Sequence, residues 1–269
     1  MEQRHTLTLP EPPFEARRFI PYNAGCGTEF GMILLYSHSQ DTQHFNQDKW
    51  RIMVQIRIGF FGDSITHGTG DETLLGWTLR VGQAEVARGH DVTVYNLGVR
   101  ADTSELVDAR WEAECQARLK SGVASANVFA IGINDSAHEK TESTEGRRVD
   151  LDRSLDVIGR MLTKAKAFGP ALWIGPTPVV KDMMPITRLP GVVYDFRNDV
   201  INIYNQAYKA KAAELDTPYL DLFTPLGADP SWTAALRKSD GLHPNSEGYI
   251  LMADHIIGWA GWRGLFDGE

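Results

Sequence analysis

A serine stands directly after an apolar run, and its position suggests covalent chemistry. The run 58–62 reads Ile-Gly-Phe-Phe-Gly, and Asp63 and Ser64 follow it at once. Open parallel α/β sheets bind their ligands at the carboxyl ends of strands, which is where this serine is expected. We therefore predict that Ser64 is a nucleophile and that the rest of the chain supplies its base and its oxyanion donors.

One histidine has a carboxylate at a spacing suited to such a base. His243 follows Asp240 in the sequence Asp-Gly-Leu-His-Pro. On a single tight turn this carboxylate reaches the Nδ1 side of the ring and leaves Nε2 free to face the serine. No carboxylate at a comparable spacing orients His67, and His138 lies in a charged loop. His243 is therefore the predicted base, and Asp240 is the residue predicted to orient it.

Acyl transfer also needs hydrogen-bond donors for the charge that develops on the carbonyl oxygen. The sequence Gly-Ile-Asn-Asp at 132–135 follows another apolar run, and the side chain of Asn134 can supply an N–H group there. Taken alone, such residues more often form a turn or cap a helix. With Ser64 and His243 predicted at the same sheet edge, the oxyanion role is favoured.

These residues need a scaffold that gathers them, and the hydrophobic pattern predicts one. Apolar runs predict strands at 54–61, 92–96, 127–131, 171–174 and 218–222. Apolar residues at helical spacing predict helices at 74–88, 104–119, 151–168, 192–215 and 246–259, the last with Ser246 as its N-cap. This alternation predicts a parallel sheet covered by helices on both faces. The loops after the strands, at 62–73, 97–103, 132–150, 175–191 and 223–245, then share one edge and build the site.

Other uses of a serine after a strand find no support in the sequence. No Gly-x-x-x-x-Gly-Lys-Ser/Thr sequence occurs, and no Gly-x-Gly-x-x-Gly opens a helix after a strand, which disfavours a nucleotide-binding loop. Thr66 stands where the nucleophile elbow Gly-x-Ser-x-Gly has its second glycine. The chain is therefore not expected to be an ordinary α/β-hydrolase.

Charge and cysteine content narrow the class of protein further. A net charge of −8 without a basic cluster argues against nucleic-acid binding. Cys26 and Cys115 offer neither a disulfide framework nor a metal-ligand spacing, and Cys115 is expected to be buried in a helix. Neither a signal-peptide pattern nor an apolar run of membrane length is present. These features predict a cytoplasmic protein that does not bind membranes.

Residues 1–52 differ in pattern from the rest of the chain. Four prolines break any helix before residue 22, and the segment 37–49 is polar and without period. Only 30–36 is apolar enough to pack. We predict a loosely ordered N-terminal extension at 1–52, or an over-long gene prediction with Met53 as the true start, before one α/β domain at 53–269. An arm that packs on the domain or on a second subunit is the alternative.

The chain resembles the SGNH hydrolases, also called the GDSL-type esterases and lipases. The resemblance is carried by Gly-Asp-Ser-Ile-Thr at 62–66, Gly-Ile-Asn-Asp at 132–135 and Asp-Gly-Leu-His-Pro at 240–244, in the family's order, and covers about residues 53–262. It implies a three-layer α/β/α sandwich of the flavodoxin-like kind, with a five-stranded parallel sheet in the order 2-1-3-4-5. It also implies ester hydrolysis through an acyl-Ser64 intermediate, without metal or cofactor.

The sequence departs from the family pattern after the second strand. The family has Asn-x-x-x-x-Gly-Asp-Thr there, and the N–H of its glycine joins the oxyanion hole. Here the block 96–103 reads Asn-Leu-Gly-Val-Arg-Ala-Asp-Thr, so Ala101 takes the glycine position. An alanine N–H still donates, provided that the residue does not need a positive φ. We favour Ala101 over Gly98 as the donor. The predicted oxyanion donors are thus the N–H groups of Ser64 and Ala101 and the side chain of Asn134.

The substrate is less well defined by the sequence than the chemistry. Met183 and Met184 in the loop 175–191 and Trp232 in the loop 223–245 are candidate pocket walls, although such residues more often serve packing. The lack of a long amphipathic lid favours a small soluble ester over an emulsified lipid. A carbohydrate O-deacetylase, a thioesterase or an acyltransferase would use the same residues. A binding module that kept the fold without activity is a further alternative. A homodimer is a guess.

Overall fold

The computed structural model describes residues 18–23, 30–36 and 51–267, and its centre is a five-stranded parallel sheet. The strands lie in the order β5-β4-β6-β9-β12, which is 2-1-3-4-5 when these five are numbered along the chain. Both the parallel sheet and its order agree with the expectation. The strands are β4 (Gln55–Gly62), β5 (Asp91–Gly98), β6 (Ala124–Ala130), β9 (Ala171–Ile174) and β12 (Tyr219–Leu220).

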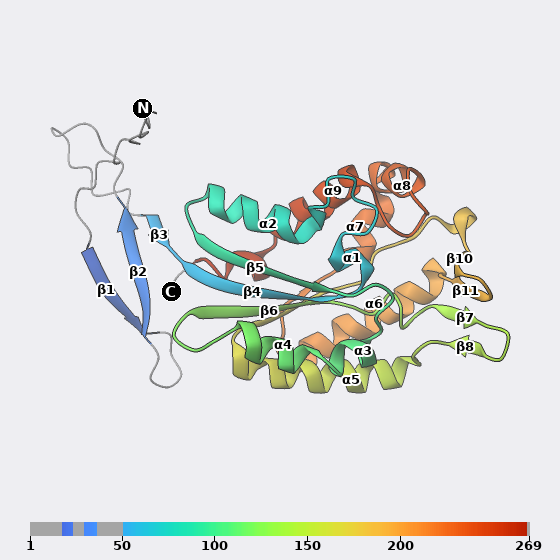
Figure 1. Cartoon of the computed structure of the whole chain (residues 1–269), viewed down its shortest axis with the longest axis horizontal. Coiled ribbons are helices and arrows are strands. Elements are labelled where there is room, and N and C mark those ends of the chain that lie inside the picture. Colours follow the sequence, from blue (N-terminus) through green and yellow to red (C-terminus); the bar gives the residue numbers. More distant parts are fainter. Residues whose placement is uncertain (1–17, 24–29, 37–50, 268–269) are drawn as a thin grey trace, which may run out of the picture.

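Helices cover both faces of this sheet, as Figure 1 shows. One face carries α2 (Gly76–Ala87) and α9 (Ser246–Ile257). The opposite face carries α3 (Ser104–Asp108), α4 (Trp111–Arg118), α5 (Leu151–Ala165) and α6 (Asn198–Glu214). Shorter helices complete the chain: α1 (Ser64–His67), α7 (Phe223–Ala228), α8 (Pro230–Arg237), α10 (Ala260–Arg263) and the 3₁₀ turns η1 (Lys166–Phe168) and η2 (Lys181–Met183).

The two sides of β4 explain why the chain forms three layers. Successive side chains of a strand point to opposite faces, so Phe60 and Phe61 enter different cores. Phe60 packs edge-on against Trp77 of α2, with ring centroids 5.2 Å apart. Phe61 packs against Trp111 of α4, with centroids 6.4 Å apart. Cys115 is fully buried in the same core as Phe61, as expected. An apolar strand buried on both faces thus delivers Ser64 to the edge of the sheet.

Three predicted helix boundaries are wrong. The helix predicted at 104–119 is two helices, α3 and α4, broken before Trp111. The helix predicted at 192–215 begins only at Asn198, because the segment Val192–Asp195 forms a strand, β11, whose β-branched and aromatic residues favour that state. The N-cap of α9 is Asn245, whose side chain accepts from the N–H of Gly248 at 3.4 Å, and not Ser246.

A second sheet occupies parts of two predicted loops and the start of the helix predicted at 192–215. Its antiparallel strands lie in the order β10-β11-β7-β8, with β7 at His138–Lys140, β8 at Glu145–Arg147 and β10 at Ile186–Leu189. It joins the segment after β6 to the segment after β9. Figure 1 shows it beyond the carboxyl ends of the central strands. The segments expected to build the site therefore have secondary structure of their own.

The described parts of the N-terminal segment form a third sheet. The strands β1 (Arg18–Asn23), β2 (Phe30–Tyr36) and β3 (Arg51–Met53) pair antiparallel in that order, and only Val54 separates β3 from β4. The rest of 1–52 lies outside the described residues, so the predicted loose extension and the predicted start at Met53 stay predictions. Across the described ranges, no helix is long and apolar enough to cross a membrane.

Candidate active site

Ser64 opens the short helix α1 directly after β4, at the carboxyl edge of the sheet. Asp63 is the N-cap of this helix, and its Oδ1 accepts from the N–H of Ile65 at 2.9 Å. A Cβ on Gly62 would lie 2.4 Å from the carbonyl oxygen of Ala130, so only glycine fits where β4 turns into the helix. The Gly-Asp-Ser sequence therefore has a local structural reason at each position.

A chain of hydrogen bonds links Ser64 to the turn before α9. The Oγ of Ser64 lies 2.7 Å from Nε2 of His243, and Nδ1 of His243 lies 2.8 Å from Oδ2 of Asp240. Ser64 and His243 are both buried, whereas the Asp240 side chain is 31% exposed. These are the distances that proton transfer between a serine, a histidine and an orienting carboxylate requires.

The Asp240 carboxylate also builds the turn that carries the histidine. Its Oδ1 accepts from the N–H groups of Leu242 and His243 at 3.0 and 2.8 Å, which leaves Oδ2 for the ring. Burial opposes ionisation of this carboxyl, but the hydrogen bonds and the ring of His243 outweigh it and hold the pKa of Asp240 well below its usual range. The carboxylate is thus ionised and fixed in place.

Gly70, on the loop after α1, packs directly behind this histidine. Its φ is +95°, and a Cβ on Gly70 would lie 3.2 Å from Cβ of His243 and 2.6 Å from the carbonyl oxygen of Pro244. Both the left-handed backbone and the close approach require glycine here. Sequence reasoning missed this contact, although two glycines within three residues of the serine helix were a signal of it.

Asn134 lies beside the serine helix, where it contacts Asp63. Its Nδ2 donates to Oδ2 of Asp63 at 3.1 Å, and both side chains are buried. An amide nitrogen carries two hydrogens, and the second has no acceptor among the described residues, so it remains for a ligand. Burial raises the pKa of Asp63 to about 7, against the opposing hydrogen bonds from Ile65 and Asn134. Asp63 thus fixes both the start of α1 and the orientation of the Asn134 amide.

The Ala101 backbone has the positive φ that the sequence prediction required it to avoid. Its φ is 66°, in the left-handed region. The N–H of Asp102 donates to the carbonyl of Val99 at 3.2 Å, so 99–102 is a turn of the type that normally has glycine at its third position. This geometry explains why the family has glycine at this position. Alanine adopts the left-handed conformation only at a cost in backbone strain.

Gly98 is already engaged in other contacts. Its N–H donates to Oδ1 of Asn96 at 3.0 Å, and a Cβ there would lie 2.3 Å from the backbone nitrogen of His67. Across the described residues, by contrast, the N–H groups of Ser64 and Ala101 have no hydrogen-bond acceptor. Two backbone donors are therefore free among the described residues, and the turn that carries Ala101 is joined to the end of β4, where the Gly62 carbonyl accepts from the N–H of Val99 at 3.0 Å.

A family model supports what this geometry suggests. The model described as the GDSL-like lipase/acylhydrolase family matches residues 60–251, which is more than half of the chain. The chain belongs to this family. It is therefore an enzyme that hydrolyses ester bonds. The family match runs from the serine strand to α9 and so includes every predicted catalytic position.

Solved structures share the fold of this GDSL-like enzyme at low sequence identity. A lipase/acylhydrolase from Enterococcus faecalis is 22% identical, with a TM-score of 0.59, over 78% of this chain and 97% of that one. TesA is 21% identical with a TM-score of 0.57 over 78% and 99%. A point mutant of Axe2, an acetyl-xylooligosaccharide esterase from Geobacillus, is 19% identical with a TM-score of 0.57 over 78% and 98%. No curated protein sequence matches the chain.

The predicted pocket walls lie in different environments in this GDSL-like chain. Met183 and Met184 are half-buried and pack against the turn of the predicted base, since a Cβ on Gly241 would lie 2.7 Å from Cβ of Met183 and 3.3 Å from Cε of Met184. Trp232 is 1% exposed in the core, and its Nε1 donates to the carbonyl of Pro178 at 3.0 Å. This placement gives Trp232 a packing role, whereas the methionines flank the site.

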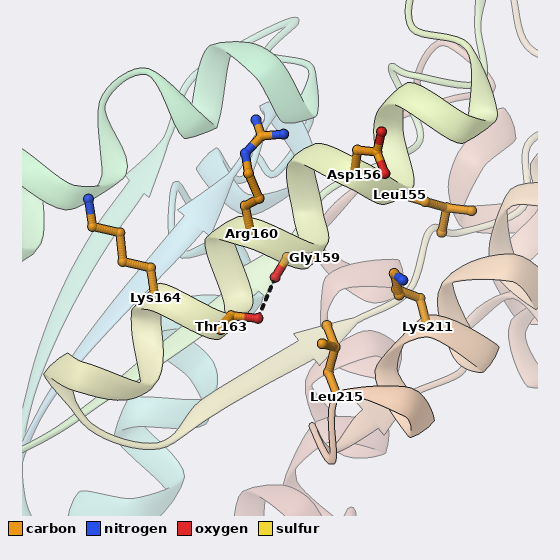
Figure 2. Close-up of a pocket in the computed structure, with 8 residues that line it drawn as sticks. All are labelled: Leu155, Asp156, Gly159, Arg160, Thr163, Lys164, Lys211 and Leu215. Carbon is orange, nitrogen blue, oxygen red and sulfur yellow. Dashed lines mark hydrogen bonds between the residues drawn. The ribbon is translucent and has the colours of Figure 1, made fainter.

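A large groove lies away from the serine. It has a volume of about 450 Å³ between α5 and α6 and is lined by Leu155, Asp156, Gly159, Arg160, Thr163, Lys164, Lys211 and Leu215, and Figure 2 shows these side chains. Its three cations each pair with a carboxylate, at 3.4, 2.5 and 2.9 Å. None of the predicted site residues lines it. Among the residues that the structure describes, no cluster of three His, Cys, Asp or Glu side chains could hold a metal ion.

Asp135 is a further buried residue of the family motif. Its Oδ1 accepts from the N–H of Ser104 at 2.8 Å, and its Oδ2 accepts from the hydroxyl of Ser154 at 2.5 Å. Burial raises the pKa of its carboxyl. Asp135 thereby ties the Gly-Ile-Asn-Asp loop to the starts of α3 and α5, a bracing role that sequence reasoning could read only as a turn or cap.

Proposed function

We propose that this enzyme hydrolyses small carboxylic esters through an acyl intermediate on Ser64. The observation that carries the proposal is the hydrogen-bond chain from Ser64 Oγ through His243 to Asp240, with links of 2.7 and 2.8 Å. A serine hydroxyl becomes a nucleophile when a positioned base takes its proton, and this arrangement supplies such a base. The family membership agrees with ester hydrolysis.

The reaction then has two acyl-transfer steps. Ser64 Oγ attacks the ester carbonyl while Nε2 of His243 takes the hydroxyl proton, and Asp240 keeps the ring oriented. His243 returns this proton to the leaving alcohol. Water, deprotonated by the same nitrogen, then attacks the acyl carbonyl, and the bond to Oγ breaks as His243 returns the proton to Ser64 and the acid leaves. The N–H groups of Ser64 and Ala101 and Nδ2 of Asn134 are the proposed donors to the oxyanion in both steps.

Small, soluble esters are the proposed substrates. The methionines at 183–184 lie against the turn of the base, and the sequence offers no long amphipathic lid to cover an emulsified lipid. An O-acetylated sugar, an acyl thioester or transfer to an acceptor alcohol would use the same three residues, so a panel of these substrates assigns the class. A cytoplasmic location and a homodimer stay predictions.

Labelling with a fluorophosphonate probe tests the proposed nucleophile. The wild-type protein should be modified at Ser64, as mapped by mass spectrometry of the labelled peptide. Ser64→Ala should abolish labelling and ester hydrolysis together. His243→Ala should lose both, whereas His67→Ala, which changes the nearby exposed histidine, should keep labelling. Ester hydrolysis that survives in purified Ser64→Ala protein would make the assignment wrong.

A further inference from the structure

The strained residue of the proposed oxyanion hole is held by an arginine from another part of the chain. Ala101 has a φ of 66°, and strained backbone persists only where its surroundings fix it. The Nη2 of Arg148 donates to the carbonyl oxygen of Ala101 at 2.9 Å, across 47 residues of sequence. The charged donor therefore acts on the strained residue itself.

The Arg148 guanidinium is fixed from several sides. Its side chain is 11% exposed, its Nε lies 3.3 Å from Oε2 of Glu139 on β7, and its Cζ lies 5.1 Å from the ring centroid of Tyr194 on β11. Its Nη1 is buried and has no hydrogen-bond partner within the described residues. A buried N–H without a partner costs stability, so the contacts that hold the guanidinium at this place must offset that cost.

A second arginine holds the same turn at a different point. Arg110 donates from Nε to Oδ2 of Asp102 at 2.8 Å and from Nη2 to the carbonyl of Gly62 at 3.1 Å. These bonds keep the turn against the end of β4 but do not touch the backbone of Ala101. Of the two arginines, Arg148 is the one that reaches the residue whose φ is positive, so their effects are separable.

We propose that Arg148 is a positioning residue for the oxyanion hole. By binding the Ala101 carbonyl, it stabilises the left-handed conformation and so keeps the Ala101 N–H aimed at the reacting carbonyl. This inference rests on the proposed function. A charge-assisted hydrogen bond is comparable in strength to the strain that an alanine suffers in this conformation, so the one contact is enough to offset it. Through Glu139 and Tyr194, the second sheet is linked to the same donor.

A rescue experiment tests this role. Arg148→Met should lower kcat roughly tenfold with little change in KM. Without the arginine, the strain at Ala101 should lower the population of its left-handed conformation by about that factor. Glycine adopts a positive φ without strain, so in an Ala101→Gly background the same Arg148→Met change should alter kcat by less than about twofold. The comparison is between the two fold-changes, each measured within its own background.

The control is the neighbouring arginine. Arg147 donates from Nη1 to the carbonyl of Ser136, and within the described part of the chain no hydrogen bond joins it to Ala101. Arg147→Met removes a similar arginine–carbonyl bond and should leave kcat within about twofold in both backgrounds. A general loss of stability in this segment would instead lower activity in the control as well.

Several results would overturn the inference. Equal losses of kcat from Arg148→Met in both backgrounds would show that the arginine acts otherwise than through Ala101, and a rise in KM alone would assign it to substrate binding. If Arg148→Met does not fold, Glu139→Gln removes the carboxylate that orients the guanidinium. This change should give a smaller fall in kcat, which the Ala101→Gly background should again remove. If the fluorophosphonate labels Ser64 in the wild type, a negative result for Arg148 overturns only the positioning role. The proposed function fails only if that labelling fails.

Discussion

Replacing Asn134 by alanine separates a catalytic role from a structural one. The amide is buried beside the serine helix, and it donates to Asp63 at 3.1 Å. Loss of an oxyanion donor costs about 2.7–4 kcal/mol in the transition state, so kcat should fall about 10²- to 10³-fold. KM should change little, because the charge to be stabilised exists only in the transition state. The carboxylate left without its donor should cost about 1–3 kcal/mol of unfolding free energy.

A matched asparagine elsewhere in the chain provides the control. Asn205 is also buried, and its Nδ2 also donates to a carboxylate oxygen, Oδ1 of Asp221, at 3.1 Å. Asn205→Ala should therefore lose a similar unfolding free energy in urea while retaining kcat on an aryl ester. Near-normal turnover in folded Asn134→Ala protein, or an equal fall of kcat in Asn205→Ala, would refute the oxyanion role.

The other predictions concern two carboxylates and one core residue. Asp240→Asn should lower kcat on the order of 10³- to 10⁴-fold. The pKa of Asp240 is lower in the folded state, so its carboxylate stabilises the wild type above about pH 4 and this stabilisation is lost as the pH falls below that value. Asp240→Asn should abolish this pH-dependent stabilisation. For Asp63 the sign is opposite, because its pKa rises from 3.8 to about 7 on folding. Stability present at low pH is therefore lost as the pH rises towards 7. The difference in unfolding free energy in urea between about pH 5 and about pH 8 should be smaller in Asp63→Asn than in the wild type. Trp232→Phe loses the 3.0 Å hydrogen bond to the carbonyl of Pro178 and should cost about 1–3 kcal/mol of unfolding free energy with KM unchanged. A raised KM would instead place this side chain in the substrate pocket.

The central sheet could be predicted because its strands leave strong signals. The strand β4 is apolar and buried on both faces from Ile58 to Gly62, and its neighbours in the sheet, β5 and β6, fall within a few residues of the predicted ranges. Once the sheet is parallel, the carboxyl ends of its strands must share an edge, and this alone brings the loops of Ser64, Asn134 and His243 together. The spacing of Asp240 and His243 also sufficed, because three residues on a tight turn fix their relative position.

What could not be predicted depends on contacts between distant segments. The strand β7 reads His-Glu-Lys, without apolar alternation, and it forms because it pairs with β11 across more than fifty residues. The same pairing converts the start of a predicted helix into a strand. The positive φ of Ala101 is equally invisible in sequence, since nothing local to an alanine demands it. Arg148, which is charged and follows another arginine, is indistinguishable in sequence from a solvated residue.

The second sheet also constrains how this enzyme can change over evolutionary time. In many α/β proteins the loops after neighbouring strands lengthen and shorten independently. Here the pairs Val193–Lys140 and Tyr194–Glu139 lock the segment after β6 to the segment after β9. A one-residue insertion within β7 or β11 would turn the side chains beyond it to the opposite face of the sheet. New specificities should therefore arise by replacement of side chains, or by compensating insertions in both segments of one lineage, and homologues with altered length in one should show altered length in the other.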